Sequence, residues 1–127
     1  MIKHLKNLEN NLRPYKFFTA TFLCEGVQDP VLVKILFNDF NVVPEFTCSY
    51  VSTGYYTVVL RNFDKLNINS TDNVGLDAEI IYCGSSQRIE GYLSEDHATI
   101  KLAVFEPSFG SLSDLAGIFT ITYYKIN

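Results

Sequence analysis

The pattern of hydrophobic and polar positions changes near residue 14. Before it, apolar residues recur at spacings of three and four, which predicts a short amphipathic helix. The residues of this apolar stripe are Ile2, Leu5, Leu8 and Leu12. Arg13-Pro14 ends the helix, because proline disfavours helical dihedrals in the residue before it. A helix this short is marginal alone in water, so we expect the stripe to pack either on one end of the following domain or on a neighbouring subunit.

From residue 15 onward, short segments rich in β-branched and aromatic residues alternate with turn residues, as in strands. The predicted strands cover residues 15–24, 31–37, 45–51, 55–60, 78–83, 88–93, 98–105 and 117–125. Both faces of the first strand are partly apolar, so we expect it to lie between two covering surfaces. Ser52-Thr53-Gly54 predicts a tight hairpin, because glycine takes the positive φ that a short loop needs. The polar stretch 62–77 predicts a long loop with one short strand at most.

About eight strands with too little helix to cover a parallel sheet predict an all-β fold, an antiparallel β-sandwich. Immunoglobulin-like and jelly-roll-like topologies both stay open, because periodicity does not give strand order. The sequence lacks the Trp and paired-Cys signature of true immunoglobulin domains, which disfavours that subtype. We expect a helical arm over residues 1–13 and one sandwich domain over residues 14–127.

Composition and charge disfavour several classes of binding partner. The chain of 127 residues has the usual size of one domain, and 47% hydrophobic residues support a real core. A net charge of −4 with scattered basic residues disfavours binding to nucleic acid or to anionic membranes, which need clustered Lys and Arg. No apolar stretch approaches the ~20 residues that span a bilayer, and the amino terminus lacks the apolar centre of a secretion signal. We therefore expect folding in a cytoplasm.

The three cysteines predict no disulfide framework. Cys24, Cys48 and Cys83 are odd in number, widely spaced and placed in strand-like segments, so we interpret them as reduced structural thiols. No pair has metal-ligand spacing, and the two histidines, His4 and His97, are remote from any cysteine. The sequence predicts neither a metal site nor a cofactor.

Catalytic chemistry has little support in the sequence. Ser94-Glu95-Asp96-His97 contains acid–base groups, but its polar character is typical of a turn between strands. Glu79 and Glu90 fall on predicted strands, where surface acids are ordinarily solvated. No nucleophile, base and orienting partner can be assembled, so we expect a non-enzymatic protein.

The order of several short sequence features carries a resemblance. They are Tyr15-Lys16, Thr19-Ala20, Phe22-Leu23, Pro30-Val31, Leu36, Asn38, Ser52-x-Gly54-x-Tyr56, Leu60, Asn73-Val74, Thr99-Ile100 and Phe119-x-Ile121-x-x-Tyr124. Over residues 14–125 the chain resembles small proteins from the structural-gene regions of tailed bacteriophages of Bacteroidetes, including crAss-like phages. The resemblance implies a virion structural protein such as a capsid decoration, head-fibre or tail accessory component. It offers no catalytic residues to carry over, and the amino-terminal helix departs from the shorter family members.

The resemblance leads to specific expectations about contacts. We expect the sandwich to attach to the major capsid protein or another virion protein, as a homo-oligomer, after synthesis in the bacterial host. The candidate partner-binding residues are Ile2, Leu5, Leu8 and Leu12 of the helix and Phe109 of the loop 106–114. Phe109 is either an anchor tucked back onto the domain or an exposed anchor for a partner, the kind of residue enriched at binding hot spots.

A glycan- or host-surface-binding module is the alternative. It would use exposed tyrosines as stacking platforms, since they supply apolar area with a hydrogen-bonding tip. The candidates are Tyr50, Tyr55, Tyr82, Tyr92 and Tyr123. Several rings exposed together beside polar acceptors would favour this function, whereas their burial would leave attachment to a virion lattice ahead.

Overall fold

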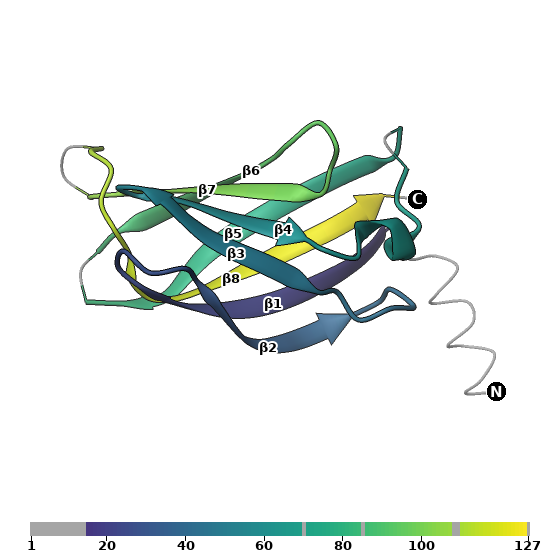
Figure 1. Ribbon diagram of the computed structural model, residues 1–127, viewed down its shortest axis with the longest axis horizontal. Helices are drawn as coiled ribbons and strands as arrows, with labels where there is room; N and C mark the ends of the chain where they lie inside the picture. Colours follow the sequence, from purple (N-terminus) through teal and green to yellow (C-terminus); the bar gives the residue numbers. More distant parts are fainter. Residues whose placement is uncertain (1–14, 70, 85, 108–109, 127) are drawn as a thin grey trace.

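The structure is a computed structural model that describes residues 15–69, 71–84, 86–107 and 110–126 (Figure 1). The predicted amino-terminal helix lies outside these ranges, together with its stripe of Ile2, Leu5, Leu8 and Leu12. Phe109 also lies outside them. The partner contacts predicted for these five residues therefore stay predictions.

The described residues form eight strands in two antiparallel four-stranded sheets. The elements are β1 (Tyr15–Glu25), β2 (Val31–Asn38), β3 (Phe46–Ser52), β4 (Tyr55–Leu60), the 3-10 helix η1 (Phe63–Leu66), β5 (Asn73–Cys83), β6 (Arg88–Leu93), β7 (Thr99–Phe105) and β8 (Ala116–Ile126). Sheet A has the order β2-β1-β8-β5, and sheet B has the order β3-β4-β7-β6. The two sheets stack as layers, which confirms the predicted all-β, sandwich-like architecture (Figure 1).

Alternation along the strands builds the core between the sheets. On sheet A, Phe18 stacks on Tyr123 with ring centroids 5.3 Å apart, and Phe22 stacks on Phe119 at the same distance. These aromatic side chains are fully buried, as are the facing apolar side chains of sheet B. The facing residues include Tyr56, Val58, Ile100 and Leu102. Each sheet thus commits one complete face to the core, as a sandwich requires.

The β5–β6 side of the sandwich is tightly packed. A Cβ added at Gly91 of β6 would lie 2.7 Å from Leu76 Cδ2 and 3.2 Å from Ala78 Cβ, both on β5. The backbone of one sheet's edge strand therefore rests directly on side chains of the other sheet. Only glycine at position 91 permits this approach.

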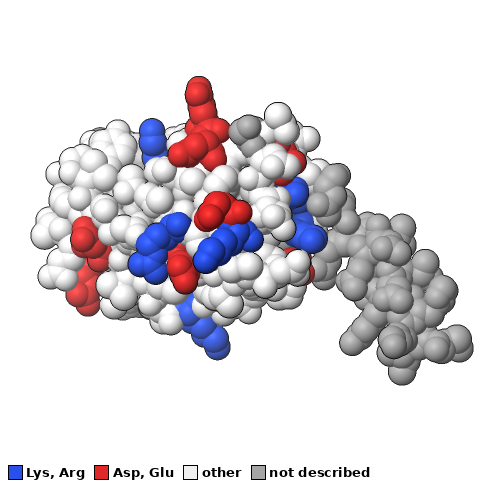
Figure 2. Space-filling view, turned by 45° about the vertical axis from the view of Figure 1, so that its right-hand side comes forward, with Lys and Arg blue, Asp and Glu red and all other residues white. Residues whose placement is uncertain are grey.

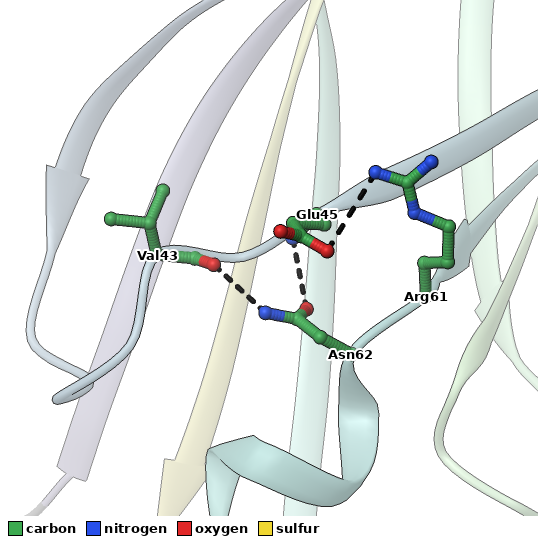
Figure 3. Close-up of polar contacts among 4 residues, drawn as sticks. All are labelled: Val43, Glu45, Arg61 and Asn62. Atoms are coloured by element: carbon green, nitrogen blue, oxygen red, sulfur yellow. Dashed lines mark hydrogen bonds and ion pairs between the residues drawn. The ribbon is translucent and has the colours of Figure 1, made fainter.

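A polar clamp holds the connection from β2 to β3 against the end of β4 (Figure 3). The buried amide of Asn62 donates to the Val43 carbonyl at 2.9 Å and accepts from the Glu45 backbone N–H at 2.9 Å. Arg61 and Glu45 add an exposed ion pair at 3.6 Å. The amide satisfies backbone groups that enter no strand ladder, so this crossover between sheets keeps one path.

One sequence expectation is wrong in its bounds: the strand predicted over residues 78–83 starts earlier, inside the polar stretch 62–77. β5 begins at Asn73 rather than near residue 78. Val74 and Leu76 pack against the core, whereas Asn73, Gly75 and Asp77 pair with outward-facing residues of β8. The polar residues are the outer positions of a half-buried strand, which resemble a loop when the strand order is unknown.

Candidate binding face

The register of β1 with β8 creates a second organised face on sheet A, opposite the core. Outward pairs alternate with the buried pairs along both strands. They are Tyr15 with Ile126, Phe17 with Tyr124, Thr19 with Thr122, Thr21 with Thr120, and Leu23 with Ile118. This outer face of sheet A therefore has an aromatic end, a central threonine band and a far apolar end.

The aromatic end surrounds a hollow of about 300 Å³. Its lining residues are Tyr15, Phe17, Asp77, Thr122, Tyr124 and Ile126. The Tyr15 ring meets Tyr124 edge-on with centroids 6.2 Å apart and lies 5.6 Å from Phe17. Phe17 in turn stacks on Phe37 of β2 at 4.6 Å. A row of aromatic contacts thus runs across three strands.

Gly75 sets the position of the Tyr124 ring. A Cβ added at Gly75 would lie 2.2 Å from Tyr124 Cζ and 2.3 Å from its hydroxyl oxygen. Tyr124 and Gly75 are direct partners in the β5–β8 register, so the ring lies across the bare backbone of the edge strand. A larger residue at position 75 would push the ring away from the hollow.

The threonine band occupies the middle of the face and carries no charge on its two central strands. Thr19 and Thr122 share a hydrogen bond between their hydroxyl oxygens at 3.1 Å. The charges lie on the flanking strands, where Lys34 pairs with Thr21, Asp77 with Thr122, and Glu79 with Thr120. The face is therefore polar in its centre without a strong field of either sign.

The far apolar end holds a second, broader hollow of about 520 Å³. It is lined by Leu23, Cys24, Glu25, Gly26, Tyr82, Ala116, Gly117 and Ile118. Tyr82 is 67% exposed there, next to an irregularity in β5 between Ile80 and Tyr82. A Cβ at Gly117 would lie 2.0 Å from the Tyr82 carbonyl oxygen, so the irregular backbone closes tightly on β8.

β2 extends the apolar surface to the edge of sheet A. Its exposed large apolar side chains are Val31, Leu32, Val33, Leu36 and Phe37. The β1–β2 register shifts twice, and Lys34 stands between the two shifts. Bulges and an edge lysine discourage pairing with a further strand. β2 therefore offers apolar side chains to a partner rather than an open backbone ladder.

The tyrosines proposed from sequence do not gather. Tyr123 is buried and donates its hydroxyl to the His97 carbonyl at 2.7 Å, and Tyr50 packs on Tyr56. Tyr55 and Tyr92 are exposed on sheet B, whereas Tyr82 is exposed on sheet A. The rings that do meet beside polar groups are those of Tyr15, Phe17 and Tyr124, which the sequence did not single out. Only the pairing of the first strand with the last brings them together.

The other candidate groups have structural roles. His97 N–H donates to the Ser94 carbonyl at 3.0 Å, and the Asp96 carboxylate accepts from the Ser94 hydroxyl and the Ala98 N–H, which confirms the predicted turn. These hydrogen bonds lower the pKa of Asp96. Glu79 and Glu90 lie in different sheets, and Glu90 accepts the Tyr92 hydroxyl at 2.6 Å.

Cys24, Cys48 and Cys83 are reduced thiols, as predicted. Cys24 is buried, whereas Cys48 and Cys83 are half-buried and pack against the core. Burial raises the pKa of the Cys48 thiol to about 11. Across the described ranges, no group of three or more His, Cys, Asp and Glu side chains is placed to hold a metal ion.

The described parts of loop 106–114 fold back onto the domain. Ser113 N–H donates to the Val104 carbonyl at 3.0 Å, and the Asp114 carboxylate accepts from Gly54 N–H at 2.9 Å. Gly54 itself has a φ of 74°, which confirms the predicted hairpin. The carboxyl-terminal end of the loop is thus fastened to sheet B, while at its other end the Glu106 N–H donates to the Ser111 carbonyl at 2.8 Å within the loop.

Charge is distributed without a dominant field in the view of Figure 2, where basic and acidic side chains lie next to one another. No helix in the described part of the chain is long and apolar enough to cross a membrane. Comparison of the chain with protein-family models, curated proteins and solved structures gave no match. The sequence resemblance to phage structural proteins therefore stays a prediction.

Proposed function

We propose that the chain is a non-enzymatic bacteriophage virion structural protein, a capsid decoration or head-fibre component that attaches by protein–protein contacts. The outer face of sheet A is the single observation that carries this proposal. Exposed large apolar side chains concentrate on the strands of that sheet. By register, Tyr15, Val31, Phe37, Tyr82 and Ile126 lie on the outer face, and the exposed Val33, Leu36 and Ile81 lie at the register shifts of the edge strands. The strands of sheet B expose Val51, Tyr55 and Tyr92.

The chemistry of this face suits a protein partner. Interface cores are depleted of charge and enriched in aromatic residues, and here the charges of Lys34, Asp77 and Glu79 stay on the flanking strands. The two apolar faces of β1 predict two covering surfaces, and within the described chain the core supplies one. A virion protein docked on sheet A would supply the other, and extended apolar patches of this kind mark interaction sites.

The predicted amino-terminal helix provides a second contact in this proposal. Its stripe of Ile2, Leu5, Leu8 and Leu12 joins copies of the chain into a homo-oligomer or docks on the particle. Replacing Leu5 and Leu8 by Ala should abolish oligomerisation, measured by light scattering, while the dispersed NMR spectrum of the sandwich persists. Unchanged oligomers and unchanged particle incorporation would remove the arm from the account.

The fold subclass bears on the proposal. The constant-type immunoglobulin order places strands ABED in one sheet and CFG in the other, whereas here the first strand lies between the second and the last. In a jelly roll successive strands lie in opposite sheets, whereas here β1–β2, β3–β4 and β6–β7 each pair within one sheet. The proposal therefore rests on the antiparallel sandwich and not on either subclass.

The test is to find the protein in purified particles of the encoding phage by mass spectrometry and density mapping. A variant with Val31→Thr, Val33→Thr and Leu36→Thr keeps β-propensity but removes exposed apolar area from β2. We expect it to fold and to be lost from particles. A control with Val27→Thr and Val43→Thr, in exposed loop positions, should incorporate normally. Absence of the wild-type protein from particles would overturn the virion assignment.

A further inference from the structure

The hollow at the aromatic end of sheet A combines features that a patch for protein contact does not need. Its volume of about 300 Å³ lies at the small end of ligand sites, suited to one ring rather than to a large ligand. Three aromatic rings, those of Tyr15, Phe17 and Tyr124, form its walls. The C–H face of a sugar ring packs well on such surfaces, while tyrosine hydroxyls remain available for hydrogen bonds.

The polar groups of the hollow come from two neighbouring strands. Asp77 of β5 and Thr122 of β8 are direct partners in the register, and both line the hollow. Asp77 is exposed, and among the described residues no hydrogen bond or ion pair engages its carboxylate. An ionised carboxylate accepts two hydrogen bonds in parallel, and such charge-assisted bonds are strong. Vicinal hydroxyls of a sugar present donors in that arrangement.

The aromatic walls are positioned before any ligand arrives. Gly75 leaves room for the Tyr124 ring, which meets Tyr15 edge-on, and Phe17 is fixed by stacking on Phe37. A site whose rings are already placed loses less conformational entropy on binding. The larger hollow at the far apolar end lacks this arrangement, because Tyr82 is the only aromatic side chain among the described residues that line it.

We propose that the hollow lined by Tyr15, Phe17, Asp77, Thr122 and Tyr124 is a carbohydrate subsite that holds one pyranose ring of a neutral glycan. The ring packs on the aromatic walls, and its hydroxyls bond to Asp77 and Thr122. One ring in an open hollow binds with a dissociation constant of about 1 mM. The inference goes beyond the proposed function, because attachment by protein contacts needs no sugar site.

The test is an NMR titration of the full-length, ¹⁵N-labelled chain with maltohexaose, cellohexaose, chitohexaose, xylohexaose and mannohexaose. We expect at least one oligosaccharide to shift the amide signals of Phe17, Gly75, Asp77 and Tyr124 with a dissociation constant of about 1 mM. Signals of sheet B should stay in place. Absence of shifts with every oligosaccharide, or shifts centred on sheet B, would overturn the proposal.

Variants separate the site from its surroundings. Asp77→Asn keeps the shape but removes the charge, and Tyr124→Ala removes a wall; each should weaken binding by about 10-fold or more. Gly75→Ala, which displaces the Tyr124 ring, should act in the same direction. Tyr82→Ala and Tyr92→Ala are matched controls in exposed positions outside the hollow and should bind normally. Should Tyr124→Ala fail to fold, Asp77→Asn decides the outcome, and undiminished binding by that variant contradicts the proposal.

The two proposals fail in different ways. A silent titration with normal incorporation into particles would remove the sugar subsite and leave the attachment face. Sugar binding by a protein that is absent from particles would remove the attachment face and leave the sugar subsite.

Discussion

Sheet A and sheet B are alike on their inner faces and different on their outer faces. Each inner face is continuous and apolar, with fully buried side chains such as Phe22 and Phe119 on sheet A and Val58 and Leu102 on sheet B. The outer face of sheet A adds aromatic and aliphatic ends around a threonine band. One sheet is therefore apolar on two sides and the other on one.

The outer face of sheet B carries charged and polar side chains, as is typical of a face exposed to solvent. Arg88 lies over the Phe105 ring at 4.8 Å, and Tyr92 donates its hydroxyl to Glu90. Lys101 stands opposite Tyr92 on the adjacent strand. Because sheet B folds with this polar, charged exterior, the sandwich does not need a second apolar face. Folding of the sandwich therefore does not require the apolar side chains on the outer face of sheet A. Contact with a partner would account for them.

The largest expected effects come from the inner faces, where the two sheets should behave alike. Phe119→Ala on sheet A should cost about 3–5 kcal/mol of the free energy of unfolding, and Leu102→Ala on sheet B about 2–5 kcal/mol, because both side chains are fully buried. Urea unfolding followed by circular dichroism measures both. A Phe119→Ala cost below that of an ordinary surface substitution would show that the sheet A core is not packed as described.

Two glycines of sheet A separate a position needed for folding, Gly117, from a position that shapes only the outer face, Gly75. Gly117→Ala brings a Cβ to 2.0 Å from the Tyr82 carbonyl oxygen, where only backbone can give way, so we expect a loss of about 2 kcal/mol or more. Gly75→Ala meets the far end of the Tyr124 side chain instead, and the ring can swing outward. That variant should lose less than about 1 kcal/mol. Equal losses in urea unfolding would contradict this assignment of the two positions.

Alkaline pH probes both inner faces together. Burial raises the pKa of Cys24 and Tyr123 on sheet A and of Cys48 and Tyr56 on sheet B, so the folded state keeps these groups neutral. At pH 8 both states are neutral, and the stabilisation is complete. As the pH rises above 9.0, the ordinary cysteine value, the unfolded state ionises first and stability falls, and the Cys48 contribution is lost near pH 11.

The measurement is the urea midpoint at pH 8, 9 and 10. We expect a steady decline, with a shallower slope for Cys48→Ala. A midpoint that does not change between pH 8 and pH 10 would contradict the burial of these four groups.

Local pattern was enough to predict most of the fold. The strand bounds from β1 to β4 follow from alternation and turn residues, and Gly54 marks its hairpin by the φ that only glycine takes easily. The start of β5 differs from the prediction because Asn73, Gly75 and Asp77 are residue types common in loops, and only their pairing with β8 makes them strand positions. Strand order was also out of reach, since nothing local to Tyr15 or Tyr124 indicates that their strands are neighbours.

The candidate site was predicted only in outline. The two apolar faces of the segment 15–24 pointed to a second covering surface, and that signal locates the outer face of sheet A. The hollow itself needs Phe17, Asp77 and Tyr124 from three strands, and its geometry depends on Gly75. The tyrosines chosen from the pattern along the chain do not line this hollow.

The most direct test of the attachment face uses exposed tyrosines on both sheets as reporters. Tyr15 and Tyr82 lie on sheet A, and Tyr55 and Tyr92 lie on sheet B, all with 40–67% of their surface exposed. Hydroxyl-radical labelling, read by mass spectrometry, compares these residues in the free protein and in purified particles. We predict that Tyr15 and Tyr82 become protected in particles while Tyr55 and Tyr92 stay labelled. Protection confined to Tyr55 and Tyr92, or equal labelling of all four in both states, would contradict the account.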